Sequence, residues 1–419
     1  MTALVDEDGA VARASAGDAG ERPWRVTVQG AAALAAAMGV GRFVYTPILP
    51  LMHAQAGLGV QQGSALATAN YVGYLVGALI GIAAPRAVRS RLTLRSSLLL
   101  ITLTLALMPV THDVTAWIVV RLVAGIASAL VFVVAVNAVL AALRAHGQHL
   151  TGWALGGVGA GIALSGLLVL ALRGADDWRQ AWWLSAVLCL VLTVPAWALH
   201  TASHDADTHT DAHTDAHTDG VTEAGTRTRT AIAKDTPGSA GGRAAWANRR
   251  FGGLFVAYSL EGVGYIIAGT FLVAAIDQSA PRWAGTGAWV LAGIAALPSS
   301  ALWARLSHTR SRPALLAVAL LIQAVGVALP ALVGGVAAAL VSAAAFGATF
   351  VGISTLALAQ GARLKAPRSV AILTTGYSVG QIAGPLLVTP LLHNGYHQAL
   401  LIAALILVAA AIADSLTLR

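Results

Sequence analysis

Long apolar stretches occupy most of this chain and restrict the folds that are open to it. A helix needs about 20 mostly apolar residues to cross the hydrocarbon core of a bilayer. The stretches that meet this length lie near residues 28–53, 63–84, 93–110, 114–140, 150–172, 179–200, 250–275, 283–306, 311–330, 333–358, 368–393 and 396–415. Charged residues are only 11% of the chain, whereas about 25% is usual, so a soluble protein of this composition could not cover its surface. We therefore predict an all-α membrane protein with twelve transmembrane helices.

One long polar segment, about residues 201–248, divides the apolar stretches into two sets of six. It is rich in Thr, Asp, His and Gly and has almost no large apolar side chains, a composition typical of disordered segments. The predicted organisation is a cytoplasmic tail, a six-helix lobe, a disordered cytoplasmic linker and a second six-helix lobe, over residues 1–25, 26–200, 201–248 and 249–419.

The basic residues indicate which side of the membrane each loop faces. The formal net charge is +8, but the 26 Lys and Arg residues form short clusters between the apolar stretches instead of one patch. If both termini are cytoplasmic, only Arg173, Arg179 and Arg282 lie in outer loops, in agreement with the positive-inside rule. We therefore predict a multi-pass protein of a bacterial inner membrane with both termini in the cytoplasm. We also predict a monomer that contacts lipid and no nucleic acid.

The two sets of helices resemble each other in sequence. Gly39-Val40-Gly41 in the first helix recurs as Gly262-Val263-Gly264 in the seventh. Val158-Gly159 and Leu167-Leu168-Val169 recur, at nearly the same distance along the chain, as Val379-Gly380 and Leu386-Leu387-Val388. Parallel repeats of this kind are typical of transporters with two pseudo-symmetric lobes, whose site lies near the midplane between the lobes.

Few ionisable residues lie inside the predicted helices, and each is a functional candidate because a charge in hydrocarbon is costly. Arg42 and Arg121 are the basic ones, and Glu261 is the one acid well inside a predicted helix, whereas Asp414 is expected to reach the interface. The repeat places Arg42 and Glu261 at similar depth across a central cavity. Arg42 suits a carboxylate or another anion, and a buried carboxyl such as Glu261 can take up and release a proton.

Two structural interpretations compete with these roles. Arg42 and Glu261 can form an ion pair that locks the lobes together, and Arg42 can instead extend to the interface or pair internally. Arg121 has a coupling role in our hypothesis, in which it binds neighbours on its own helix or carbonyls near the cavity and couples gating to protonation.

Further candidates for substrate contacts share helix faces with these charges. Tyr258 and Tyr265 flank Glu261 at helical spacing, and Tyr45 lies one turn from Arg42 beside Pro47, where a break in the helix is expected to expose carbonyls. The predicted substrate-binding set is Arg42, Tyr45, Asn70, Tyr71, Tyr74, Tyr258, Tyr265, Tyr377 and Gln381. For Tyr377 and Gln381, hydrogen bonding between helices is an equally good interpretation.

Other classes of site find little support. The run from His209 to Asp219 places His at every fourth position, but it is a low-complexity tract, so we predict no metal site. The chain has no Gly-x-x-x-x-Gly-Lys-Ser/Thr segment, which argues against ATP as the energy source and against a nucleotide cofactor. A membrane enzyme needs clustered acids or His, and the adjacent pair Asp176-Asp177 has no further acids nearby.

Several motifs resemble a known family. Arg121-Leu-Val-Ala-Gly125-Ile-Ala-Ser-Ala129 resembles the Arg-x-x-x-Gly-x-x-x-Ala motif of the major facilitator superfamily. The segments 38–52, 69–77 and 156–166 are similar to its YbfB/YjiJ-type branch. The resemblance implies a twelve-helix, two-lobed fold and rocker-switch transport. Two residues depart from the superfamily pattern, namely Pro85 where an Asp is usual and Ile162 where drug antiporters have a proline.

These observations predict a secondary active transporter that moves a small organic solute, an organic anion, by alternating access coupled to protons. Proton-driven efflux of amphipathic drug-like compounds is the first alternative, although Ile162 weakens it. The alternative from another class is a membrane sensor or scaffold that transports nothing.

Overall fold

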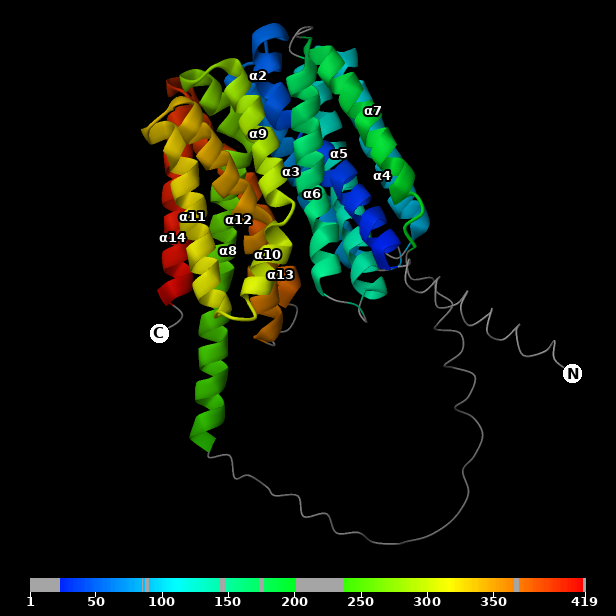
Figure 1. Ribbon diagram of the computed structural model, residues 1–419. Helices are drawn as coiled ribbons and strands as arrows, with labels where there is room; N and C mark the ends of the chain where they lie inside the picture. Colours follow the sequence, from blue (N-terminus) through cyan, green and yellow to red (C-terminus); the bar gives the residue numbers. More distant parts are fainter. Residues whose placement is uncertain are drawn as a thin grey trace, which may run out of the picture.

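The computed structural model describes residues 23–84, 86, 90–143, 146, 148–172, 177–200, 237–364 and 369–416, and every regular element within them is helical. Figure 1 shows two helical lobes side by side, the first coloured blue to green and the second yellow-green to red. Each lobe contains one of the two predicted sets of helices, so the two-lobed all-α fold is confirmed.

The first lobe begins with a span over Pro23–Gln55, which is interrupted by a π-helical turn. Its elements are η1 (Ala35–Val40), α2 (Tyr45–Gln55), α3 (Val60–Ala83), α4 (Arg91–Leu107), η3 (Met108–Val110), α5 (Val114–Ala142), α6 (Gln148–Ala171) and α7 (Trp178–Ala196). Polar residues before the helices set where several of them begin. The side chain of Asp113 accepts hydrogen bonds from the amides of Thr115 and Ala116, and Asp177 and Ser90 cap α7 and α4 in the same way.

The second lobe begins with the longest helix, α8. Its elements are α8 (Pro237–Ser279), α9 (Arg282–Ala296), α10 (Ser299–Leu306), α11 (Arg312–Leu332), α12 (Gly335–Arg363), α13 (Ser369–Val388), η6 (Thr389–Asn394) and α14 (Tyr396–Leu416). Within the described ranges, ten helices are long and apolar enough to cross a membrane, or eleven if the pair α9–α10, bent by 43°, is one span. Helix α13 lies where the sequence predicts the eleventh of twelve spans.

The first span is broken as predicted, but the break lies before the prolines and not at Pro47. The amides of Gly41 and Phe43 reach back five residues, to the carbonyls of Ala36 and Met38, as expected for a π-turn. Residues 41–44 form a turn before α2 starts at Tyr45. Gly39 lets the π-turn lie directly against the backbone of Gly161 in α6. A Cβ at position 39 would collide with that backbone.

Hydrogen bonds join the lobes from the start of α2 to the end of the bundle where α2 ends, which is the upper end in Figure 1. The hydroxyl of Thr46 donates to the Gly269 carbonyl of α8 (2.6 Å), and Ser64 and Thr389 hydroxyls lie 2.6 Å apart. Tyr396 Oη and His53 Nε2 lie 3.0 Å apart. Elsewhere along the interface α6 packs closely on α9. A Cβ added at Gly159 of α6 would collide with the backbone of Leu297 and Gly293.

The start of α8 differs from the prediction. The helix begins at Pro237, whereas residues up to 248 were expected to belong to a disordered linker. Proline suits the first turn of a helix because its missing amide hydrogen has no partner there. Residues 201–236, including the His/Asp tract, and residues 1–22 lie outside the described residues.

Deletion of residues 204–232 is expected to leave membrane insertion, melting temperature and any transport activity close to those of the parent protein. The segment cannot form a core, and shortening a long connection changes the free energy of folding only slowly. Fluorescence size-exclusion chromatography and a thermal melt of the purified variant test this. A variant that inserts normally but has lost its activity would point instead to a regulatory or metal-binding role of the segment.

Candidate functional site

Arg42 lies at the break in the first span, facing the second lobe. Its side chain is 2% exposed, and its guanidinium carbon lies 4.3 Å from the ring centre of Tyr74, 4.9 Å from that of Tyr71 and 5.4 Å from that of Phe43. Its Nη2 donates a hydrogen bond to Oε1 of Gln381 in α13, and its Nε has no hydrogen-bond partner in the described ranges. Aromatic faces and one neutral amide therefore stabilise this buried cation.

Arg121 holds the backbone on which Arg42 is placed. Its Nη1 and Nη2 donate to the carbonyls of Gly41 and Arg42, at 3.4 and 3.2 Å, and its guanidinium lies 4.9 Å from the ring centre of Tyr45. Asn70 donates to the Arg121 carbonyl at 3.0 Å. The structure therefore brings Tyr45 and Asn70 to Arg121, whereas Tyr71 and Tyr74 surround Arg42.

Replacement of Arg121 by Lys is expected to reduce solute binding and activity about tenfold or more without preventing insertion. The planar guanidinium donates to two successive carbonyls and packs on Tyr45, and a single ammonium cannot reproduce that geometry. Binding affinity and uptake rate of Arg121→Lys are the measurements. If the variant works as well as the parent, only the positive charge at this position matters, and the proposed coupling role is wrong.

Five aromatic rings from α8, α12 and α13 lie nearly parallel, and we call them the parallel ring stack. Tyr377 lies between Tyr258 and Tyr265, with ring centres 4.6 and 5.6 Å apart and planes inclined by 14° and 12°. Tyr265 continues onto Phe350 (5.1 Å, 9°), and Phe350 onto Phe346 (5.8 Å, 5°). Such offset stacking is favourable, and it holds rings from three helices in one orientation.

Glu261 of α8 lies within this aromatic region. Its side chain is 0% exposed, and neither carboxyl oxygen has a hydrogen-bond partner among the residues that the structure describes. Tyr258 and Tyr265 lie three and four residues from Glu261 along α8 and so share its helix face, and Tyr377 stacks on both of them.

The described part of the chain contains no ion pair between Arg42 and Glu261, because the Glu261 oxygens are unpartnered and Arg42 binds Gln381. The lobes are joined here by Arg42 and a neutral amide, so the predicted alternative of an Arg–Glu lock does not describe this arrangement.

Some residues of the region were not predicted. Phe43 of the first lobe approaches Phe350 edge-on, with ring centres 5.9 Å apart. Phe346 and Phe350 lie one turn apart in the stretch 333–358, a spacing that places both on one helix face and could have indicated them. Asp414 was expected at the interface, but its side chain is 0% exposed. Asp414 lies on α14, which packs against α8, the helix that carries Arg250.

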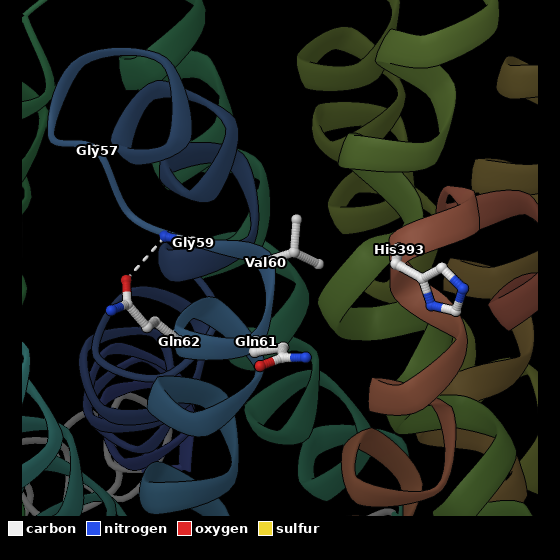
Figure 2. A pocket seen from close by; sticks show the side chains of 6 residues that line it. All are labelled: Gly57, Gly59, Val60, Gln61, Gln62 and His393. Atoms are coloured by element: carbon white, nitrogen blue, oxygen red, sulfur yellow. Dashed lines mark hydrogen bonds between the residues drawn. The ribbon is translucent and has the colours of Figure 1, made fainter.

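A pocket of about 540 Å³ opens at the upper end, between the start of α3 and η6. Figure 2 shows Val60 and Gln61 facing His393 across it, with the Gly59 amide bonded to Oε1 of Gln62 (2.8 Å). It is lined by Gly57, Gly59, Val60, Gln61, Gln62 and His393, and it contains neither Arg42 nor Glu261. Within the described ranges, no group of three or more His, Cys, Asp or Glu residues could hold a metal ion.

Comparisons with known proteins agree on the fold. The profile of a family described as "Uncharacterised MFS-type transporter YbfB" matches residues 34–228 and 227–415. A crystal structure of a point mutant of the nucleoside transporter NupG superposes with a TM-score of 0.66 at 14% identity, covering 94% of this chain and 100% of that chain. A second NupG crystal structure gives 0.65 at 13% identity, covering 94% and 99%. No curated protein matches the sequence.

Proposed function

This chain belongs to the family of the uncharacterised MFS-type transporter YbfB, and from that premise we propose that it carries a small organic anion together with protons across the bacterial inner membrane. Membership of this family makes it a secondary transporter and not an enzyme. The cargo, the coupling ion and the orientation are our proposal. The observation that supports it most is a buried Arg42 whose only hydrogen-bond acceptor in the described ranges is the neutral amide of Gln381.

An anion is the cargo that best balances the charges of the site. Arg42 and Arg121 are both buried, and Glu261 is the only buried acid beside them in the described ranges. The site therefore has an excess of positive charge, which is larger still when Glu261 is protonated. A buried cation without a carboxylate partner is costly, and a substrate carboxylate would neutralise it. Anions of one or two negative charges therefore fit the site better than cations.

Glu261 supports the coupling to protons. Glu261 is completely buried, and neither of its oxygens is hydrogen-bonded in the described ranges, so no donor there holds it in its charged form. An anion bound at Arg42 adds negative charge to the same buried region and favours the protonated form of Glu261, and protonation in turn favours the anion. Such coupling is reciprocal, so a lower pH should tighten substrate binding and substrate should draw in a proton. This is the cooperativity that symport requires.

The orientation follows from the basic residues. With both termini in the cytoplasm, the hydrogen bonds of His53 and Ser64 close the outer side of the bundle. Rocking of the two lobes would break them to admit solute from outside. The parallel ring stack also suits an amphipathic drug-like compound, so efflux of such compounds is the second candidate.

A ligand screen followed by flux measurements tests the proposal. Purified protein is heated with carboxylates, amino acids, sugars, nucleosides and cationic drugs, because a ligand of the native state raises the melting temperature. We expect organic anions to stabilise the protein, more so at lower pH, and a proton gradient to drive their uptake into proteoliposomes. Stabilisation by cationic drugs alone would favour efflux. Absence of any gradient-driven flux would favour a sensor or scaffold.

A further inference from the structure

The amide of Gln381 takes the place on Arg42 that an anionic ligand would need. Gln381 and Arg42 are 1% and 2% exposed and come from different lobes, and the Gln381 oxygen accepts from Nη2. An amide oxygen is a neutral acceptor, whereas a carboxylate adds the attraction between opposite charges and can accept from two guanidinium nitrogens at once. A carboxylate that reaches this position is therefore expected to displace the amide.

The unpartnered nitrogen of Arg42 indicates how such a carboxylate would bind. Nε and Nη2 present their hydrogens on the same edge of the planar guanidinium, and a carboxylate can accept from both with its two oxygens. In this structure Nη2 donates to Gln381, and Nε has no partner among the described residues. One carboxylate in this pose would satisfy both nitrogens, which the single oxygen of Gln381 does not.

The parallel ring stack indicates the shape of the rest of the ligand. Tyr258, Tyr377 and Tyr265 hold their planes within 14° of their neighbours, and Phe350 continues this orientation. A flat ring is the shape that packs against such planes over its whole face. Phe43 links this stack to the cation, because its ring centre lies 5.4 Å from the guanidinium carbon of Arg42 and 5.9 Å from the ring centre of Phe350.

We propose that the loaded site holds a flat aromatic carboxylate, with its two oxygens on the Nε–Nη2 edge of Arg42 in the place of the Gln381 amide oxygen, and with its ring against the parallel ring stack. This inference rests on the proposed function and names the class of its substrate. Displacement of Gln381 also removes a hydrogen bond between the lobes, so loading loosens their contact at the centre of the bundle.

The experiment measures binding of benzoate to the purified full-length protein by calorimetry, with two ligands as controls. Cyclohexanecarboxylate has the same charge and a similar size but is not flat, and benzamide has the same ring without the charge. We expect benzoate to bind roughly tenfold more tightly than cyclohexanecarboxylate. We expect benzamide to bind at least about a hundredfold more weakly than benzoate.

Variants of Gln381 test the displacement. Gln381→Ala removes the competing amide and should tighten benzoate binding about threefold to tenfold. Gln381→Glu places a carboxylate on Arg42 within the protein and should weaken benzoate binding at least about a hundredfold. Gln323→Ala is the matched control, because Gln323 of α11 is also a fully buried glutamine of the second lobe. It should bind benzoate like the parent. A thermal melt of each variant without ligand shows whether the variant is folded. If Gln381→Glu is not folded, the result for Gln381→Ala alone decides whether benzoate displaces the amide.

The possible failures are distinguishable. If benzoate binds the parent but Gln381→Ala does not bind it more tightly, the displacement is wrong and anion transport is unaffected. If cyclohexanecarboxylate or benzamide binds as well as benzoate, the flat carboxylate is the wrong class. If none of the three ligands binds while another anion is transported, only this inference fails. If no anion binds or is transported at all, the proposed function fails with it.

Discussion

Glu261→Gln is expected to bind substrate and to exchange it across the membrane, but to lose accumulation driven by protons. Glutamine has the shape and neutrality of the protonated acid, and it cannot release a proton. Glu261 is completely buried and has no hydrogen-bond partner among the described residues, so the substitution breaks no bond that the structure records. Folding should therefore be preserved while coupling is lost.

The size of this effect follows from the energy of a proton gradient. A difference of one pH unit across the membrane is about 1.4 kcal/mol, enough for roughly tenfold accumulation at one proton per solute. The parent should reach about that ratio in proteoliposomes, and Glu261→Gln should not exceed equilibration. The affinity of the parent for the anion should also rise as the pH falls, because the anion prefers the site with Glu261 protonated. The affinity of Glu261→Gln for the anion should be independent of pH.

Asp414→Asn is the matched control for this experiment. Asp414 is also a fully buried acid of the second lobe, and it lies on α14 near Arg250, away from Arg42. Its variant should accumulate substrate like the parent if it is folded. If Glu261→Gln accumulates substrate against its gradient as well as the parent does, the proton site lies elsewhere or transport is not coupled to protons.

The sequence was sufficient for the architecture because helix length and charge placement are local properties. Apolar stretches of membrane length predicted elements such as α5 and α12, and rare buried charges identified Arg42, Arg121 and Glu261 as candidates. These inferences need no knowledge of how the helices turn about their axes. The start of α8 was missed because a Gly-rich segment has the composition of a linker.

Side-chain partners between lobes could not be predicted in the same way. The repeat alignment treats the first and seventh helices as equivalent, but η1 contains a π-turn that α8 lacks. A π-turn inserts about one extra residue and rotates everything after it. Arg42 follows this turn directly, so its direction could not be derived from the position of Glu261. In the structure the partner of Arg42 is Gln381. From the sequence alone, a substrate contact and a hydrogen bond between helices were equally good interpretations of the Gln381 amide.

Arg42→Met is expected to weaken binding of anionic substrate by at least about a hundredfold. Its melting temperature should be unchanged or higher than that of the parent. Truncating one partner of a buried, hydrogen-bonded charge pair costs on the order of 2–5 kcal/mol of binding energy. A buried charge without an ionic partner contributes little to folding, and replacing it with an apolar side chain of similar length is often neutral or stabilising. Loss of binding without loss of stability is therefore the signature of a residue kept for its ligand.

Two further variants separate charge from geometry at this position. Arg42→Lys keeps the charge but has no planar edge to hold both carboxylate oxygens, so its affinity should lie between those of Arg42→Met and the parent. Arg95→Met is the control, since Arg95 also lies over an aromatic ring, 4.8 Å from the centre of Trp197, but is partly exposed on α4. Its binding should be unchanged. If Arg42→Met instead binds substrate normally but melts at a much lower temperature, Arg42 is an internally paired structural residue and the anion site lies elsewhere.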